Sequence, residues 1–141
     1  AKSEDYSAIL FVGGHGTMWD FPDDAVLKYL TRQMYESGKP VAAVCHGPAA
    51  LVNVTLRNGQ YLVKGKRVAA FTDTEEMEVG MANVVPFMLE AVLKERGARH
   101  QPADNWQCNV VIDGLLITGQ NPQSASAVGE ALCQTLLAVI I

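Results

Sequence analysis

Charged side chains are scarce in this chain of 141 residues. Asp, Glu, Lys and Arg together make up 18% of it, against about 25% in a typical domain. The apolar share of 49% is ordinary, which argues against a disordered chain. The length suits a single domain over residues 1–141. With so little charge, we expect that much of the chain is buried or that its surface meets another chain or segment.

Long apolar runs and basic clusters are absent too. Stretches such as 8–12 and 136–141 are far shorter than the roughly 18 residues of a membrane span, and we expect no secretory signal. Lys plus Arg number 11 and Asp plus Glu 15, a net charge of −4 with neutral His. No Lys/Arg run occurs, so we expect no nucleic-acid partner. The short apolar stretches and the unpaired cysteines lead us to expect a cytoplasmic protein without a membrane partner.

The sequence also lacks closely spaced pairs of cysteines. The chain has three cysteines, Cys45, Cys108 and Cys133, and none forms a CxxC pair. This odd, unpaired set argues against a disulfide scaffold and against a zinc site, so we expect reduced thiols and no bound metal. Cys108 and Cys133 are interpreted as structural, which leaves Cys45 as the candidate for chemistry.

What the sequence does contain is an alternation of strands and helices. Solid apolar runs are typical of strands buried on both faces, whereas apolar residues three and four apart indicate helices. We expect strands at 8–12, 40–44 and 66–71, helices between Pro22 and Gly38, at 49–56, at 83–96 and from near Pro122, and a hairpin of 110–112 with 115–118 around Asp113-Gly114. This order predicts an α/β fold whose mainly parallel sheet has helices on both faces. The predicted sheet has fewer strands than a compact α/β domain usually has.

Cys45 follows the second of these strands and precedes the apolar segment 49–56. A nucleophilic residue between strand and helix is typical of a nucleophile elbow, a tight turn that needs small neighbours such as Ala43 and Gly47. Unpaired N–H groups and the dipole of the helix would lower the pKa of the thiol and favour the thiolate. The backbone N–H of His46 would point at an oxyanion. A buried core cysteine is the plainer alternative.

A glycine-rich loop, Gly13-Gly14-His15-Gly16, follows the first strand. Parallel strands end at one crevice, so we expect this loop to meet the nucleophile turn and bind substrate. Its N–H groups, that of Gly14 in particular, would complete an oxyanion hole. A phosphate-binding loop and a plain glycine turn are the alternatives. Trp19 is expected to wall the crevice, with contributions from the loops 105–107 and 120–122.

His46 is the candidate general base or orienting partner, and an imidazole needs an acid to fix its tautomer. Three acids, Asp73, Glu75 and Glu76, follow the third strand. By chemistry alone all three qualify, and an acidic helix cap is the alternative interpretation.

Four motifs together resemble the ThiJ/PfpI superfamily and, within it, the branch of heat-shock-type chaperones and glyoxalases. They are GGHGTMWDFP at 13–22, VCHGP at 44–48, FTDTEE at 71–76 and ITGQNP at 117–122, and the resemblance covers nearly the whole chain. It implies a flavodoxin-like three-layer sandwich and a triad of Cys45, His46 and Glu76. It also implies a cofactor-free, glutathione-independent glyoxalase III that converts methylglyoxal to D-lactate. Holdase and deglycase activities are attributed to relatives.

Members of this family begin with a βαβ segment that carries a glutamate beside the nucleophilic sulfur. The present chain resembles the later part of that fold, so the opening part is a separate chain or segment, was cut away, or is truly missing. As partners we expect a small 2-oxoaldehyde substrate, a second copy of the chain in a homodimer, and unfolded proteins if the protein is a holdase.

Other functions stay open. A cysteine hydrolase or peptidase would use the same thiol, although an amidotransferase is disfavoured because no His follows Asp104. A non-catalytic chaperone would use apolar surface left by an incomplete sheet. A redox sensor would use oxidation of Cys45 to the sulfenic or sulfinic acid.

Overall fold

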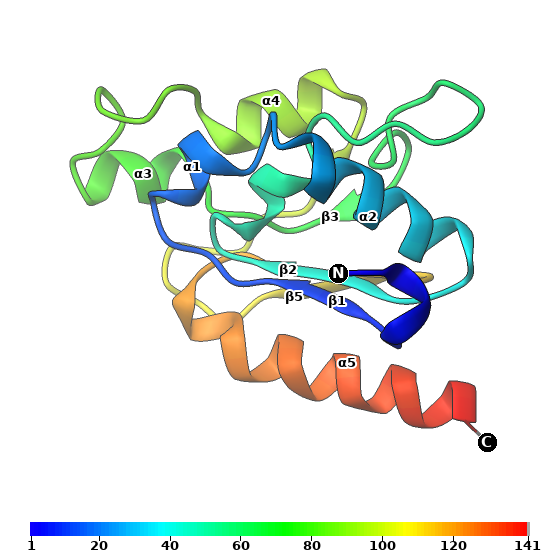
Figure 1. Cartoon of the computed structure of the whole chain (residues 1–141). Coiled ribbons are helices and arrows are strands. Elements are labelled where there is room, and N and C mark those ends of the chain that lie inside the picture. Colours follow the sequence, from blue (N-terminus) through cyan, green and yellow to red (C-terminus); the bar gives the residue numbers. More distant parts are fainter. Residues whose placement is uncertain (141) are drawn as a thin grey trace.

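A four-stranded sheet forms the middle layer of the fold (Figure 1). In spatial order its strands are β1 (Ile9–Phe11), β2 (Val41–Val44), β6 (Leu116–Gly119) and β5 (Val110–Asp113). The first three are parallel, and β5 pairs with β6 in the antiparallel sense. Two further strands form a separate parallel pair, β3 (Arg67–Val68) and β4 (Arg99–His100).

The computed structural model describes residues 1–140; the side chains of 139 and 140 lie outside the described part. Within that part, no helix combines the length and the apolar content that a membrane crossing requires. The single domain expected over 1–141 stays a prediction.

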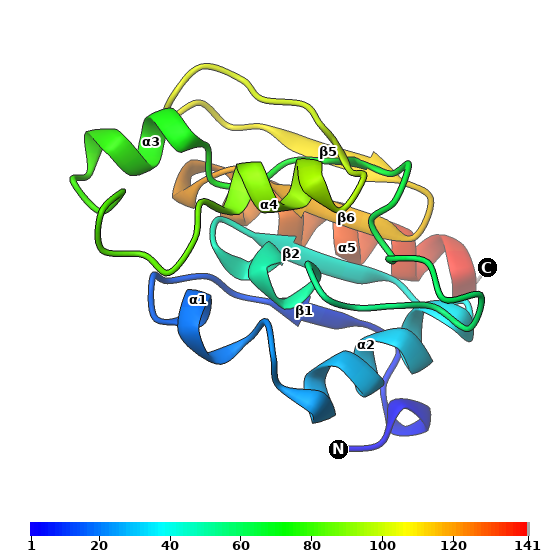
Figure 2. The same cartoon turned by 90° about the horizontal axis from the view of Figure 1, so that it is seen from above.

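Helices cover both faces of the sheet (Figure 1). One face carries α5 (Ala125–Ile140), and the other carries α1 (Thr17–Asp20), α2 (Ala25–Glu36), α3 (Asp73–Glu78) and α4 (Leu89–Glu95). Short 3-10 helices occupy Ser3–Asp5, Gly47–Ala50 and Pro122–Ser124. Figure 2 shows the strand order from above, with α2 beside β1 and α4 over the middle of the sheet. The predicted α/β fold, with a mainly parallel sheet between helical layers, is confirmed.

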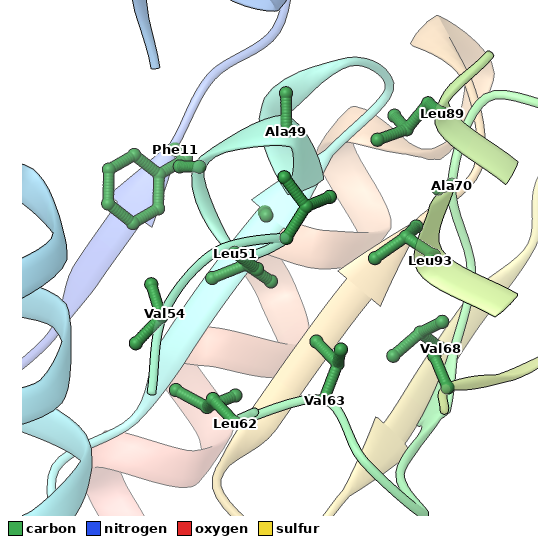
Figure 3. Packing of buried hydrophobic residues seen from close by; sticks show 14 of the residues in the cluster. Phe11, Ala49, Leu51, Val54, Leu62, Val63, Val68, Ala70, Leu89 and Leu93 are labelled. Carbon is green, nitrogen blue, oxygen red and sulfur yellow. The ribbon is translucent and has the colours of Figure 1, made fainter. Parts of the chain in front are cut away.

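The second strand, β2, is buried on both faces because a helical layer covers each of them. Val41 and Ala43 belong to the larger of two apolar clusters, and Ala42 and Val44 to the smaller one beside α5. Its sequence is therefore a solid apolar run, as predicted. The larger cluster also contains Phe11, Leu51, Leu62, Leu89 and Leu93 (Figure 3). Full burial of one such leucine contributes about 1.5–3 kcal/mol.

The prediction that residues 8–12 are buried on both faces is wrong. Ile9 and Phe11 pack into the larger cluster, but Leu10 and Val12 are 40% and 65% exposed. The cause is the place of β1 at the edge of the sheet, whereas α5 packs against β2 and β6. The residues of the strand do not themselves indicate whether it lies at the edge or in the middle of the sheet.

The predicted helix at 49–56 is also wrong. Gly47–Ala50 is a 3-10 helix, and turns follow it. The Leu51 N–H donates to Pro48 O and the Val54 N–H donates to Leu51 O, so the backbone bonds are too short in span for an α-helix. These residues are buried, and apolar content alone does not separate a buried helix from buried turns.

Two further elements are shorter than predicted. The helix expected at 83–96 is confined to α4, because Pro86 lacks an N–H and disfavours helical backbone in the residue before it. The strand expected at 66–71 pairs with β4 only over Arg67–Val68. Beyond it, the Ala69 N–H donates to Thr118 Oγ1 and the Phe71 N–H to Cys45 O, which carries the chain toward β2.

The hairpin and the first long helix are confirmed. Strands β5 and β6 flank Gly114, whose φ of 59° suits glycine in a tight turn. Helix α2 begins after Asp24, whose carboxylate accepts the Leu27 N–H at 3.0 Å.

Candidate active site

Cys45 lies on a strained turn directly after β2. Its φ of 64° is in the left-handed region, which costs a non-glycine residue about 1–3 kcal/mol. Two hydrogen bonds hold the turn: the Cys45 N–H donates to Gly119 O at 3.0 Å, and the Phe71 N–H donates to Cys45 O at 3.1 Å. The expected elbow is therefore present, and it puts Sγ at the carboxyl end of the sheet.

Glycines surround this turn because no side chain fits there. A Cβ on Gly13 would lie 2.7 Å from Val44 O and 3.0 Å from Cys45 Cβ, and a Cβ on Gly47 would collide with Phe11 O. The glycine-rich loop and the nucleophile turn are therefore in contact, as the sequence predicted.

Two contacts lead from Cys45 to Glu76. Cys45 Sγ lies 3.5 Å from His46 Nδ1, and His46 Nε2 lies 2.7 Å from Glu76 Oε2. The His46 ring is 1% exposed. An ionised carboxylate only accepts hydrogen bonds, so His46 donates from Nε2 and its Nδ1 is left as an acceptor facing the thiol. The imidazole is placed to take the proton of Cys45.

A second imidazole contacts the other oxygen of Glu76. His15 Nε2 lies 2.6 Å from Oε1, and its ring centroid lies 4.2 Å from that of His46. The three side chains bring potential ligand atoms within 4.8 Å of one another, a set that a transition metal could use. As arranged, the carboxylate already engages both Nε2 atoms, so the structure describes a hydrogen-bonded cluster.

The pKa of the Cys45 thiol corrects the expectation of a resting thiolate. Burial raises this pKa to about 11; the backbone N–H of His46 lowers it, and the charges of Glu75 and Glu76 raise it further. The expected helix dipole is missing because only a 3-10 helix of four residues follows the turn. Burial also lowers the pKa of His46, against the opposing effect of Glu76. The resting pair is a neutral thiol beside a neutral imidazole.

Glu75 and Asp73, the two other candidate acids, do not contact His46. Glu75 is fully buried and accepts hydrogen bonds from the backbone of Thr72 and Trp106 and from the side chains of Thr72, Gln120 and Asn121. It forms a capping box with Thr72 at the start of α3. The backbone N–H of Asp73 donates to Glu90 Oε1 at 3.0 Å.

A pocket of about 410 Å³ opens beside Cys45. Gly13, Gly14, His15 and His46 line it, as predicted, together with Val12, Val44, Phe71, Val79, Trp106, Pro122 and Ala125. The predicted wall residue Trp19 is not among them: it lies on α1 and is 50% exposed. Trp106 is the tryptophan that lines the pocket.

Trp106 is a residue that sequence reasoning underweighted. Its φ is 65°, its N–H donates to Glu75 Oε2 at 2.9 Å, and its ring lies 5.7 Å from that of Phe71. The sequence pattern that could have indicated it is Thr72-x-x-Glu75, which is typical of a capping box. In such a box one oxygen of the glutamate caps the helix, and the other is left to accept a hydrogen bond from another segment. The sequence held no signal for which segment that would be.

A model of the DJ-1/PfpI family matches residues 1–135. "Glyoxalase 3" of Candida albicans is 35% identical over 132 residues, covering 89% of this chain and 56% of that protein. "Glutathione-independent glyoxalase HSP31" of Saccharomyces cerevisiae is 36% identical over 130 residues, covering 88% and 55%. The chain thus spans little more than half the length of these relatives.

Solved structures match as well. The crystal structure of glyoxalase III from Candida albicans aligns with a TM-score of 0.90 at 32% identity, covering 95% of this chain and 59% of that one. Rapid Encystment Protein 24 KDa of Francisella tularensis aligns with a TM-score of 0.94 at 45% identity, covering 96% and 60%.

Proposed function

Because the chain belongs to the DJ-1/PfpI family, we propose that it acts as a glutathione-independent glyoxalase that converts methylglyoxal to D-lactate. Relatives that are 35% and 36% identical carry the names glyoxalase 3 and glutathione-independent glyoxalase. The observation that carries the proposal is Cys45 on its strained turn, with Sγ 3.5 Å from an imidazole that hydrogen-bonds to a buried carboxylate.

The first step is addition of the thiol to the aldehyde carbon. His46 Nδ1 takes the proton as the S–C bond forms, which matters because the thiol pKa of about 11 leaves little free thiolate at neutral pH. Glu76 stabilises the imidazolium that results. The carbonyl oxygen becomes an oxyanion, and the backbone N–H groups of Gly14 and His46 are the proposed donors to it.

The second stage moves hydrogen between the two carbons of the hemithioacetal. A base removes the proton from the carbon bound to sulfur, giving an enediol, and protonation of the neighbouring carbon yields a 2-hydroxy thioester. Water then cleaves the C–S bond, restoring the thiol and releasing the 2-hydroxy acid. The net change is addition of one water, so the reaction needs no redox cofactor. Proton transfer by positioned groups contributes about 10²–10⁴-fold.

The pocket suits a small, weakly polar substrate. Its wall is formed largely by apolar side chains, among them Val44, Phe71 and Trp106, and the cysteine and two histidines also line it. Such a lining limits water around the thioester before hydrolysis and strengthens the hydrogen bonds to the oxyanion.

The test is D-lactate formation from methylglyoxal by the full-length protein and by Cys45→Ala. We expect the variant to lose all measurable turnover, because no other side-chain thiol, hydroxyl or amine lines the described pocket. Unchanged turnover in Cys45→Ala would overturn the proposal. Cys45→Ala also serves in a peptidase assay: peptide cleavage by the wild type that disappears in the variant, without any D-lactate formation, would favour the cysteine hydrolase instead.

A second candidate role is binding of unfolded proteins. The exposed apolar side chains of Leu10 on the edge strand β1, of Val12 directly after it and of Tyr6 before it favour this role. The predicted homodimer would use the same kind of surface. A holdase would suppress aggregation equally well as Cys45→Ser, whereas protection through aldehyde removal would disappear in that variant.

A further inference from the structure

The carboxylate of Glu76 is held by two imidazoles. His46 donates to Oε2 at 2.7 Å and His15 to Oε1 at 2.6 Å. In the described part of the chain, no other donor contacts these oxygens, and the side chain is 3% exposed. The position of the acid that orients His46 therefore depends on His15 as well.

We propose that His15 is a positioning residue: its bond to Oε1 holds the Glu76 carboxylate so that Oε2 keeps His46 Nδ1 free to accept the Cys45 proton. The inference rests on the proposed role of Cys45 as the nucleophile, but not on the identity of the aldehyde. It assigns His15 a function through Glu76 and His46, in place of the direct contact with substrate that the sequence suggested.

The geometry explains why one donor is insufficient. A carboxylate that accepts at one oxygen only can turn about its terminal bond, and a buried, unpaired Oε1 would seek another donor. The 2.6 Å bond from His15 is short, as charge-assisted bonds are, and it removes that freedom. With both oxygens engaged, His46 has one acceptor for Nε2–H and one tautomer.

The surroundings fix His15 in turn. Its ring lies 4.2 Å from that of His46 and meets Phe71 edge-on at 6.0 Å. The His15 side chain is 31% exposed, whereas that of His46 is 1% exposed. A variant at position 15 therefore changes the hydrogen bond, the ring packing and the pocket lining together, and the experiment has to separate these effects.

Two amide variants make that separation. The amide nitrogen of glutamine lies about as far along the side chain as His Nε2, so His15→Gln keeps a donor for Oε1. The amide nitrogen of asparagine corresponds to Nδ1, so His15→Asn does not reach it. Both variants lose the ring and the titratable group, and only the hydrogen bond distinguishes them.

The first measurement is alkylation of Cys45 by iodoacetamide as a function of pH, in the full-length protein with Cys108 and Cys133 changed to Ser. We expect His15→Asn to react roughly 10²-fold more slowly than wild type at neutral pH, with a rate that rises toward high pH as the thiol itself ionises. His15→Gln is expected to stay within threefold of wild type, by the same argument that the retained donor preserves the base.

The second measurement is turnover of methylglyoxal. We expect His15→Asn to lower kcat by a similar factor while KM changes less than twofold, because the residue acts on the base and not on substrate binding. His15→Gln should restore most of kcat. Equal losses in both variants, an effect on KM alone, or unchanged alkylation in His15→Asn would overturn the inference.

Two safeguards keep the result decisive. Thermal unfolding of each variant shows whether the fold is intact; if His15→Asn does not fold, His15→Leu takes its place, since leucine fills the space without a donor. If the wild type forms no D-lactate, the proposed function fails, yet the alkylation rates of the Gln and Asn variants still decide the role of His15.

Discussion

Glu75 and Glu76 are neighbours on the first turn of α3, both are buried, and they are held in opposite ways. Glu75 accepts from backbone N–H groups, one hydroxyl and two side-chain amides, on Thr72, Trp106, Gln120 and Asn121. Glu76 accepts from two imidazoles. Amides and hydroxyls keep their protons, so the hydrogen bonds of Glu75 are structural, and they tie three segments together. An imidazole can accept a proton and return it, so Glu76 supports proton transfer through His46.

The pKa values follow the same division. Although burial opposes it, the hydrogen bonds from Trp106, Asn121 and Thr72 hold the pKa of Glu75 below its ordinary value. Glu75 is thus ionised at neutral pH, and its hydrogen bond from the backbone of Trp106 holds a residue that lines the pocket. Substitutions at the two positions should therefore produce different defects.

The largest expected effect is that of Glu76→Gln on catalysis. An amide at this place offers a donor to His46 Nε2, which would favour the tautomer with a proton on Nδ1, facing the thiol. The corresponding change in a Ser–His–Asp triad lowers kcat by about 10⁴-fold, and we expect a loss of roughly 10³–10⁴-fold here. Turnover of methylglyoxal measures it, with thermal unfolding as the control. A variant with near-normal turnover would remove Glu76 from the proposed mechanism.

Next is the effect of Glu75→Ala on stability. The change leaves several buried donors unpaired, at about 1–3 kcal/mol each, and we expect the free energy of unfolding to fall by about 3–5 kcal/mol. Urea denaturation measures it. Glu76→Gln is the matched control, with a loss of about 1 kcal/mol. Similar losses at both positions would contradict the division between the two carboxylates.

A smaller effect is expected from pH. Burial lowers the folded-state pKa of His46 and of His100, with Glu76 and Glu90 opposing it. The unfolded state then binds more protons below about pH 6.5, so stability falls as pH drops below that value. Glu75, whose pKa is also lowered, adds a loss only below about pH 4.5.

Denaturation midpoints between pH 8 and pH 4 check this order. His100→Gln keeps a donor for Ala70 O and removes one of the two histidines whose pKa is lowered, so the part of the slope near pH 6 that disappears in this variant belongs to His100. A wild-type stability that is flat from pH 8 to pH 5 would show that the imidazoles do not titrate as described.

The smallest expected effect is that of Trp106→Phe. The aromatic contact with Phe71 and the hydrogen bond from the backbone N–H to Glu75 remain. Only the hydrogen bond from the indole Nε1 to Glu78 Oε2 at 3.0 Å is lost. We expect a loss of about 1 kcal/mol in stability and a KM within a few-fold of wild type. An effect as large as that of Glu75→Ala would mean that the indole, and not the carboxylate, holds the wall.

Sequence reasoning was most reliable where one local pattern sets the structure. The apolar run before Cys45 and the glycines beside it predicted the buried strand and the strained turn, because both requirements are steric. The turn at Asp113-Gly114 predicted the hairpin for the same reason.

It was least reliable where the answer depended on distant parts of the chain. Exposure of Leu10 follows from the place of β1 in the sheet, and the pKa of Cys45 follows from burial and from two carboxylates some thirty residues away. His100 lies between the polar residues Arg99 and Gln101, yet its side chain is fully buried. From chemistry alone, a choice among Asp73, Glu75 and Glu76 needed the direction in which each side chain leaves α3. Adjacent positions on a helix point in directions about 100° apart.

Gly13 carries no reactive atom, yet its missing side chain sets the gap between two loops. One loop bears His15 and the other bears Cys45, and a single methyl group at position 13 would lie 2.7 Å from the carbonyl oxygen of Val44. One loop would have to move away from the other, and the His15 ring would move away from the His46 ring, whose centroid lies 4.2 Å from it. Glycine at position 13, although unreactive, thus sets the distance between the two loops, and the gap is too narrow for one additional carbon atom.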